Sequence, residues 1–438
     1  MPAAPARIAA FNILLRVERE QAYAVELLHS KLLDELSPAD RNLATEMVLG
    51  VLRWRSLLDE MISLFSSSPM RKLDVEVLTS LRIGAYQLSF LARVPDHAVL
   101  NDSVELVKHA RKRSAAGMVN AILRKMVAQT HSGERIRSQG SLATTFAHPV
   151  WLVERWIGHY GFDIAARICA YDQQIPVTTL RLNDAGDEGP LRQQGIQLTP
   201  GALMKTARRV TTGDITHTAF FRDRRLAIQD EGSQLVAALA GCGGRILDCC
   251  AAPGGKTAAL ATRLPGAQII ASELHPRRAH LLRQLAPQSN VSVVAADALQ
   301  LPFAAEFDCV LADVPCSGTG TLARNPEIKW RLRPEDISDL QSRQISILRA
   351  AMRYVSRGGR LVYSTCSLEP EENEQVLAAC LDSTVDFRVT PIERELVRLR
   401  DSGELVWNAE TLVSGDFLRT VPGVHPCDGF FAAVLQRN

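Results

Sequence analysis

The sequence has no run of 18 apolar residues, which a helix needs in order to cross a bilayer. Its one candidate for a signal-peptide core, Ile8–Leu15, runs into four charged residues within the next five positions, without an evident cleavage site. Cysteine is also scarce: the nine cysteines are an odd number, and no two form a C-x-x-C pair. We therefore expect reduced thiols in a cytoplasmic protein, rather than a secreted disulfide framework or a zinc ribbon.

The length and charge allow several globular domains. At roughly 150 residues per domain, 438 residues predict about three. The net charge of +2 is too small to indicate a nucleic-acid partner, but basic residues are in excess in the first 150 positions. The densest basic run there consists of Lys108, Arg111, Lys112, Arg113, Arg124 and Lys125. This run is either an ordinary solvated face or a patch that binds phosphates.

The first third of the chain has helical periodicity. Apolar residues recur at helical spacing, as in Leu73, Val77, Leu81 and Leu88. Ser37-Pro38 predicts a helix start, with a capping side chain followed by proline in the first turn. We expect an all-α domain over residues 1–140.

Two stretches of this domain resemble a known family. Val94–Leu106 and Gly117–Arg124 are similar to the signature stretches of the NusB-like RNA-binding helical domain. The basic run lies between and beside them, where a helix end and a loop could meet RNA phosphates.

A short middle region follows a linker-like stretch, Thr130–Gly140. Strands are expected at Val177–Leu182 and Arg225–Gln229, with a Gly- and Asp-rich loop at Asp184–Pro190 between them. We expect a small α/β segment over residues 141–230.

Residues 231–438 show a different pattern, in which short apolar runs alternate with helical ones. This alternation predicts a parallel, doubly wound, Rossmann-like sheet whose ligand lies beyond the carboxyl ends of the strands. Helices are expected at Pro276–Leu285 and Asp336–Val355. The expected strands are Arg245–Cys249, Gln268–Ser272, Val291–Ala295, Phe307–Ala312, Gly359–Ser364 and Phe430–Leu435.

The loop after the first of these strands has the composition of a ligand cradle. Small residues there let the backbone approach a ligand at a helix N-terminus. A Walker phosphate loop is disfavoured, because the position six before Lys256 holds Cys250 rather than glycine. The loop reads Cys250, Ala251, Ala252, Pro253, Gly254, Gly255, Lys256 and Thr257.

Two acidic residues after later strands suit a nucleoside. Glu273 comes about 20 residues after the glycines, where a carboxylate can accept both hydroxyls of a ribose. NAD and S-adenosylmethionine both carry that ribose, but the fingerprint G-x-G-x-x-G is absent, which favours S-adenosylmethionine. Asp297 could meet the adenine edge, or it could cap a helix.

Two further strands end in cysteine-containing loops. Asp313 and Cys316 follow the fourth expected strand, and Cys366 follows the fifth, so two thiols and a carboxylate should converge at one edge of the sheet. Cys249, Cys309 and Cys380 lie within strand or helix patterns, and we expect them in the core.

These motifs resemble those of the RNA cytosine-5 methyltransferases. The resemblance covers Cys250–Thr257, Asp313–Gly318, Ser364–Ser367, Gln229–Gln234 and Asp428–Phe431. With the NusB-like front, the order is similar to that of the RsmB (Sun, Fmu) family, whose members act on bacterial 16S rRNA. The likeness spans nearly the full length, although Glu273 stands where many members have Asp.

The resemblance implies a covalent mechanism with S-adenosyl-L-methionine as methyl donor. Cys366 would add to carbon 6 of the cytosine, Asp313 would hold the base, Cys316 would assist elimination, and Lys256 would favour the thiolate. DNA cytosine-5 methyltransferases use the Pro-Cys cysteine as nucleophile, so a swapped assignment of Cys316 and Cys366 stays open. The residues expected to hold the donor are Cys250–Lys256, Glu273, Asp297 and Asp313.

The family also suggests partners. We expect a monomer that needs no metal and no membrane, and that meets 16S rRNA before the subunit is fully assembled. Arg324, Lys329 and Arg331 could hold the RNA backbone, with Trp330 stacking or packing. The middle segment resembles the RNA-binding segment of these enzymes, and its arginines at 208, 209, 222, 224 and 225 would suit that role. A tRNA methyltransferase and a non-catalytic NusB-like RNA-binding or antitermination factor are the alternatives.

Overall fold

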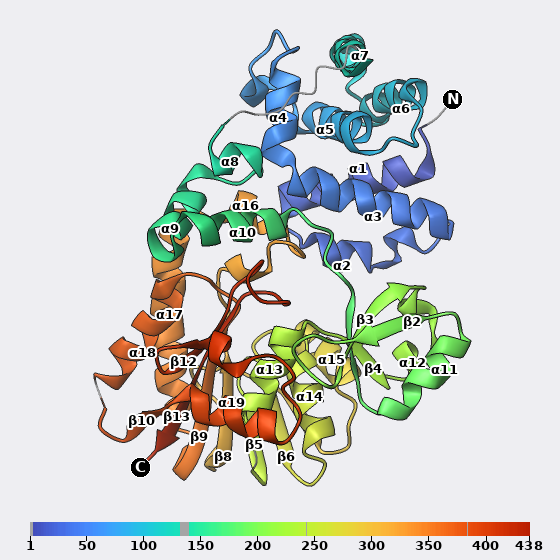
Figure 1. The fold of residues 1–438 in the computed structure, drawn as a ribbon. Helices are drawn as coiled ribbons and strands as arrows, with labels where there is room; N and C mark the ends of the chain where they lie inside the picture. Colours follow the sequence, from blue (N-terminus) through green and yellow to red (C-terminus); the bar gives the residue numbers. More distant parts are fainter. Residues whose placement is uncertain (1–2, 132–139, 242, 383) are drawn as a thin grey trace. The chain divides into compact units, whose positions relative to one another are not determined.

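The computed structural model describes residues 3–131, 140–241, 243–382 and 384–438, which form two units (Figure 1). The first unit contains the chain up to Ile175 together with Leu322–Arg331, and the second contains Pro176–Thr321 and Leu332–Asn438. The sequence places domain boundaries at 140 and 230 instead, so residues 141–175 lie with the helical part here. Most of the predicted linker, residues 132–139, lies outside the described residues.

The described part of the first unit is built from helices, as the periodicity predicts. Ser37 caps one of them, because its Oγ accepts a hydrogen bond from the backbone N–H of Asp40 at 3.1 Å. The helices are α1 (Pro5–Glu20), α2 (Ala24–Leu28), α3 (Pro38–Arg53), α4 (Arg55–Ser63), α5 (Val75–Phe90), α6 (Asp96–His109), α7 (Ala116–His131), α8 (Leu142–Thr145), α9 (Val150–Tyr160), α10 (Phe162–Asp172) and the inserted α16 (Ile328–Arg331).

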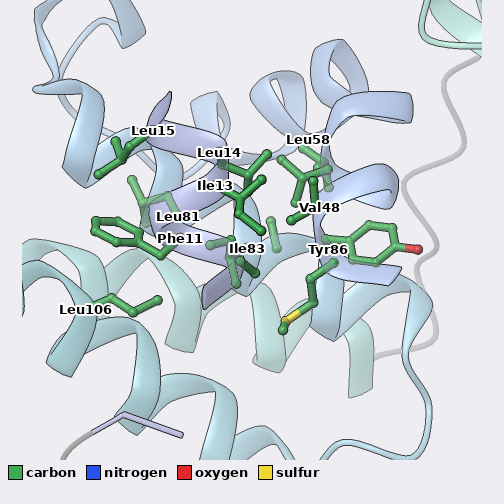
Figure 2. Packing of buried hydrophobic residues seen from close by; sticks show 14 of the residues in the cluster. Phe11, Ile13, Leu14, Leu15, Val48, Leu58, Leu81, Ile83, Tyr86 and Leu106 are labelled. Atoms are coloured by element: carbon green, nitrogen blue, oxygen red, sulfur yellow. The ribbon is translucent and has the colours of Figure 1, made fainter. Parts of the chain in front are cut away.

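Apolar faces of helices α1 and α3 to α6 meet in one core (Figure 2). Phe11 and Ile13 of α1 pack among Leu81 and Ile83 of α5, and all four are at most 1% exposed. A Cβ atom at Gly50 would lie 2.0 Å from Cζ of Tyr86, so glycine is what lets that ring approach α3. The hydroxyl of the same tyrosine donates to Glu46.

The inserted segment 322–331 corrects one prediction about RNA contacts. Lys329 is 1% exposed, and its Nζ donates to the carbonyl oxygens of Arg53 at 3.0 Å and Ala147 at 3.1 Å. The indole N–H of Trp330 donates to the carbonyl of Leu52, and Arg331 donates to backbone carbonyls of residues 17, 21 and 22. The prediction that Lys329 holds RNA is therefore wrong, because its amine is buried and hydrogen-bonded inside the helical unit.

The second unit contains a small antiparallel sheet in the order β2-β3-β1-β4. The sequence predicts two of its strands, β1 (Thr179–Leu182) and β4 (Leu226–Ile228). It misses β2 (Gln197–Pro200) and β3 (Ala207–Thr212), whose residues are mostly polar. Two short helices, α11 (Glu188–Gln193) and α12 (Ala219–Arg222), accompany the sheet.

The larger sheet has the order β11-β12-β13-β9-β8-β5-β6-β7, with β10 paired to β13 (Figure 1). Its central strands β7, β6, β5, β8 and β9 pair in parallel, as predicted. The strands are β5 (Arg245–Asp248), β6 (Gln268–Glu273), β7 (Val291–Ala295), β8 (Phe307–Asp313), β9 (Val355–Thr365), β10 (Phe387–Thr390), β11 (Val413–Ser414), β12 (Phe417–Thr420) and β13 (Phe430–Arg437).

The expectation of a wholly parallel sheet is wrong for its last strand. β13 runs antiparallel to β9 and also to β12. Its residues from Phe430 to Leu435 are all buried, and a continuous apolar run looks the same in either direction. The sequence pattern therefore predicts the strand but not its orientation.

Helices cover both faces of this sheet, and strand residues alternate between two apolar cores. Ile246 packs with α13 (Glu231–Leu239), α14 (Gly255–Arg263) and α19 (Ile392–Asp401), whereas Leu247 packs with α17 (Pro334–Met352) and α18 (Glu374–Leu381). A further helix, α15 (Pro276–Leu285), joins β6 to β7. No helix among the described residues has the length and apolarity that a bilayer crossing requires.

Candidate active site

The loop after β5 lies where the sequence places a ligand cradle. It leads from Asp248 into α14, and Gly254 stands at the helix start with φ of 117°, a conformation that favours glycine. A Cβ atom at Gly254 would also lie 2.8 Å from the side chain of Leu282. The loop is held against β6 by a hydrogen bond from the N–H of Ala251 to the carbonyl of Ser272 at 2.9 Å.

Two features of this loop fit a bound nucleoside ligand such as S-adenosylmethionine. At Gly255, a Cβ atom would meet nothing nearer than Nε2 of Gln229, at 3.6 Å, so the helix N-terminus is open. Asp248 is 1% exposed; its Oδ2 accepts from Thr257 at 2.7 Å, and among the described residues its Oδ1 has no hydrogen-bond partner. Burial raises the pKa of Asp248 to about 7.

The two acidic residues expected to contact the nucleoside of a methyl donor lie at the ends of β6 and β7. Glu273 is buried, and its Oε1 accepts from the backbone N–H of His275 at 3.0 Å and lies 3.8 Å from Arg278. Asp297 is exposed and caps a turn by accepting from the N–H of Leu299 at 3.0 Å. Asp297 therefore caps the turn that follows β7.

Asp313 ends β8 and has a partner on each carboxylate oxygen. Oδ2 accepts from Nζ of Lys256 at 2.7 Å, and Oδ1 accepts from the hydroxyl of Ser364 on β9 at 2.7 Å. Burial opposes the charge on Lys256, but the neighbouring Asp313 carboxylate raises the pKa of Lys256 above its ordinary value. Lys256 also interacts electrostatically with Cys366 and lies 5.1 Å from the ring centroid of Phe430. This lysine is a fixed positive charge at the site.

The two loop cysteines meet, as the strand order predicts. Sγ of Cys316 and Sγ of Cys366 are 3.2 Å apart, and the backbone N–H of Cys366 points at Sγ of Cys316 at 3.3 Å. The hydrogen bond with Cys366, together with burial, raises the pKa of Cys316 well above its ordinary value. Cys316 is therefore a protonated thiol at neutral pH, able to donate to the sulfur of Cys366.

The other cysteines expected in the core are buried there. Cys249, Cys309 and Cys380 are at most 2% exposed. In the loop after β5, Cys250 is half-buried, and its hydrogen bond with Cys249 raises its pKa well above the ordinary value. Burial in the core makes Cys249, Cys309 and Cys380 poor candidates for nucleophiles.

Several residues of the site were missed by reasoning from the sequence. Glu372, in the turn after β9, is fully buried beside both cysteine loops. Arg181 is buried, donates to Gln229 at 2.9 Å, and has its pKa lowered to about 10 by burial. A signal for Glu372 existed, because an acid six residues after Cys366 lies close to a loop already expected in the site.

The basic residues expected to bind RNA fall into two groups. On α6, α7 and the turn between them, Lys108, Arg111, Arg113, Arg124 and Lys125 are exposed. Lys112 pairs with Asp74 at 2.9 Å. In the small sheet region, three of the five arginines form ion pairs: Arg208 with Glu188, Arg209 with Glu231 and Arg225 with Asp187.

Comparisons with known proteins cover the whole chain. Residues 240–436 match the family described as "16S rRNA methyltransferase RsmB/F", and residues 4–128 match the NusB family. The chain is 34% identical to "Probable ribosomal RNA small subunit methyltransferase B" of Bacillus subtilis (strain 168), with 98% of each chain covered.

Two solved structures share the fold. The crystal structure of PH0851 superposes with a TM-score of 0.83 at 22% identity, covering 100% of both chains. NSun6 from Pyrococcus horikoshii, solved with SFG, gives a TM-score of 0.56 at 19% identity, over 66% of this chain and 98% of that chain.

Proposed function

Because the chain belongs to the RsmB/F family of 16S rRNA methyltransferases, we propose that it transfers a methyl group from S-adenosyl-L-methionine to carbon 5 of a cytosine in 16S rRNA. The observation that carries the proposal is the pair of thiols 3.2 Å apart, beside the Lys256–Asp313 ion pair at the carboxyl edge of the sheet. A thiol nucleophile, a second group that can take a proton and a carboxylate that can hold the base suit methylation of this carbon.

The donor site is assigned to the loop after β5 and to the ends of β6 and β7. When bound, S-adenosyl-L-methionine supplies a methyl group that an electron-rich carbon can attack. Residues Cys250–Lys256 would hold it at the N-terminus of α14, where backbone N–H groups are directed outward. Glu273 would accept from the ribose hydroxyls, and Asp297 and Asp313 complete the expected set.

Cys366 acts as the nucleophile in this proposal. Carbon 5 of cytosine is a weak nucleophile, so the sulfur of Cys366 first bonds to carbon 6, and carbon 5 becomes electron-rich. The S–H of Cys316 and the ammonium of Lys256 both favour negative charge on that sulfur. The assignment of the nucleophile to Cys366 rather than to Cys316 follows the likeness of Ser364–Ser367 to the family motif.

Asp313 positions the base. Its carboxylate, fixed by Lys256 and Ser364, would accept from the exocyclic amino group of a flipped-out cytosine. That contact holds the ring beside Cys366. It also favours protonation of the ring nitrogen as the adduct forms.

Cys316 then releases the product. Once the sulfur of Cys366 is bonded to carbon and uncharged, the electrostatic cause that held Cys316 protonated weakens, and Cys316 can give its own proton to water. As a thiolate, Cys316 then takes the proton from carbon 5. The electron pair of that C–H bond re-forms the C5–C6 double bond as the C6–S bond breaks, and Cys366 leaves as a thiolate.

The helical unit binds the RNA in this account. The exposed basic residues of α6 and α7 can neutralise phosphates, and the NusB match covers the same helices. We assign the protein a monomeric, cytoplasmic form that needs no metal and that acts on 16S rRNA before subunit assembly is complete.

Bisulfite mapping of 16S rRNA tests the proposed function. In cells that lack the protein, one cytosine of 16S rRNA should lose its methyl group. A plasmid encoding the wild-type chain should restore it, and one encoding Cys366→Ala should not. An unchanged 16S rRNA together with a lost methyl group in a tRNA would contradict the proposed substrate.

A further inference from the structure

A single buried carboxylate lies behind both thiols of the site. Glu372 ends the short turn Pro370–Glu372 after β9 and is 0% exposed. Its Oε1 accepts from the backbone N–H of Ser317 at 2.8 Å and from Nε2 of Gln344 at 2.8 Å. Its Oε2 accepts from the hydroxyls of Ser317 and Ser367. Four donors therefore converge on one side chain.

The donors come from the residues next to the two cysteines. Ser317 directly follows Cys316, and Ser367 directly follows Cys366; their hydroxyl oxygens are 3.0 Å apart. Gln344 of α17 adds to the arrangement, since its Nε2 also donates to the carbonyl of Pro315 at 2.9 Å. Glu372 thus bonds to both cysteine loops at once.

We propose that Glu372 is a positioning residue that sets the separation of the two thiols, so that both can reach one cytosine ring. This role rests on the proposed function, in which Cys366 attacks carbon 6 and Cys316 takes the proton from the adjacent carbon 5. Adjacent ring atoms require two sulfurs held close together.

Other bonds also join the two loops: the N–H of Leu368 donates to Oγ1 of Thr319 at 2.9 Å, and the N–H of Cys366 points at Sγ of Cys316 at 3.3 Å. Backbone bonds join them on either side of Cys316, from Val314 N–H to the carbonyl of Ser364 at 3.0 Å and from Gly320 N–H to that of Cys366 at 2.9 Å. Between these points, Glu372 binds both the backbone and the hydroxyl of Ser317. Without it, the turn that holds Cys316 can move relative to Cys366.

Glutamine would loosen this arrangement. The groups facing Oε1 are N–H groups, which only donate, and the hydroxyls facing Oε2 donate to it as well. In Glu372→Gln the two hydroxyls would have to turn and accept from the amide NH₂, and the negative charge that strengthens all four bonds would be lost, with almost no change in volume. The substitution therefore disturbs the bonding without creating a cavity.

Thiol oxidation measures the separation directly and needs neither RNA nor methyl donor. Diamide, an azo compound, converts two neighbouring thiols into a disulfide and takes up the two hydrogen atoms to become a hydrazine. We expect the wild-type chain to form a Cys316–Cys366 disulfide rapidly, as followed by peptide mapping under non-reducing conditions. Glu372→Gln should form it at least tenfold more slowly.

Glu395→Gln is the matched control. Glu395 is a buried carboxylate of the same unit that bonds to Arg360 and Arg398, and Arg360 is the middle residue of β9, six positions before Cys366. Its variant should oxidise at the wild-type rate. Removing the negative charge of Glu372 would make Cys316 easier to ionise, and a more readily ionised thiol oxidises faster. Slower oxidation of Glu372→Gln would therefore come from a greater distance between the two sulfurs. Equal rates in Glu372→Gln and the wild type would overturn the proposal.

A second variant keeps the test decisive if Glu372→Gln does not fold. Ser317→Ala removes one hydroxyl donor and changes no charge, and about threefold slower oxidation is expected. In the variant that folds, methyl transfer to RNA should persist, while release of the protein–RNA adduct slows and the KM for RNA stays unchanged. A wild-type chain that transfers no methyl group would refute the proposed function, whereas unchanged oxidation in both variants would refute the role of Glu372.

Discussion

The buried lysine of the inserted segment predicts an unusual dependence of stability on pH. Lys329 is 1% exposed, and burial lowers its pKa from 10.5 to about 7. A neutral amine has two N–H groups, which match the two carbonyls, of Arg53 and Ala147, that it contacts. Asp172 favours the charged form and Arg53 opposes it, but burial is the largest cause.

The sign and size of the effect follow from proton binding. Between pH 7 and pH 10.5 the unfolded chain binds a proton at this lysine that the folded chain does not, so stability rises with pH over that window. The full shift in the pKa of Lys329 corresponds to about 5 kcal/mol in the free energy of unfolding. About 2 kcal/mol of this stability is regained as the pH rises from roughly 7 to 9.

Urea unfolding of the full chain measures this dependence. The stability difference between the wild type and Lys329→Met should move in favour of the wild type by about 2 kcal/mol from roughly pH 7 to pH 9. Loss of the two hydrogen bonds adds a cost that does not vary with pH. Lys125→Met, at an exposed position, should show no such change. A difference for Lys329→Met that stays flat with pH would refute the reasoning.

Three further predictions concern charge in the two units. Lys256→Met leaves Asp313 without its cation, and methyl transfer should fall about 100-fold in single-turnover assays, with little change in RNA affinity. The raised pKa of Asp248 means that the wild-type chain loses stability as pH rises from 3.8 to about 7, because the buried carboxyl loses its proton less readily than in the unfolded chain. Asp248→Asn has no such proton and should gain stability relative to the wild type over this range, as measured by urea unfolding at both ends of it. Replacing exposed Arg111 and Arg113 by Gln should weaken RNA binding and lower the slope of log K against log salt by about 2 in filter binding.

The catalytic sheet was largely predictable because its strands are buried on both faces. Continuous apolar runs between turn residues mark such strands, as in β8, which was predicted at Phe307–Ala312 and spans Phe307–Asp313. The strands β2 and β3 were not predicted, because their side chains are mainly polar or partly exposed and no apolar run marks them. The antiparallel direction of β13 could not be predicted, because it depends on pairing with β9 and β12 rather than on composition.

The site was predictable as far as topology determines it. Parallel strands end at one edge, which is enough to bring Cys316 and Cys366 together, but their separation depends on hydrogen bonds made by Glu372. For Lys329, the sequence predicted a binding role that the structure contradicts. A cation beside tryptophan and arginine in the sequence suggested RNA, and only the structure shows that helices enclose it.

The covalent step is tested most directly by trapping the protein on its RNA. With S-adenosyl-L-methionine and 16S rRNA, Cys316→Ala should accumulate an adduct that survives denaturing electrophoresis, because attack proceeds while elimination stalls. Cys366→Ala should form none. Adduct accumulation in Cys366→Ala, with none in Cys316→Ala, would contradict the account.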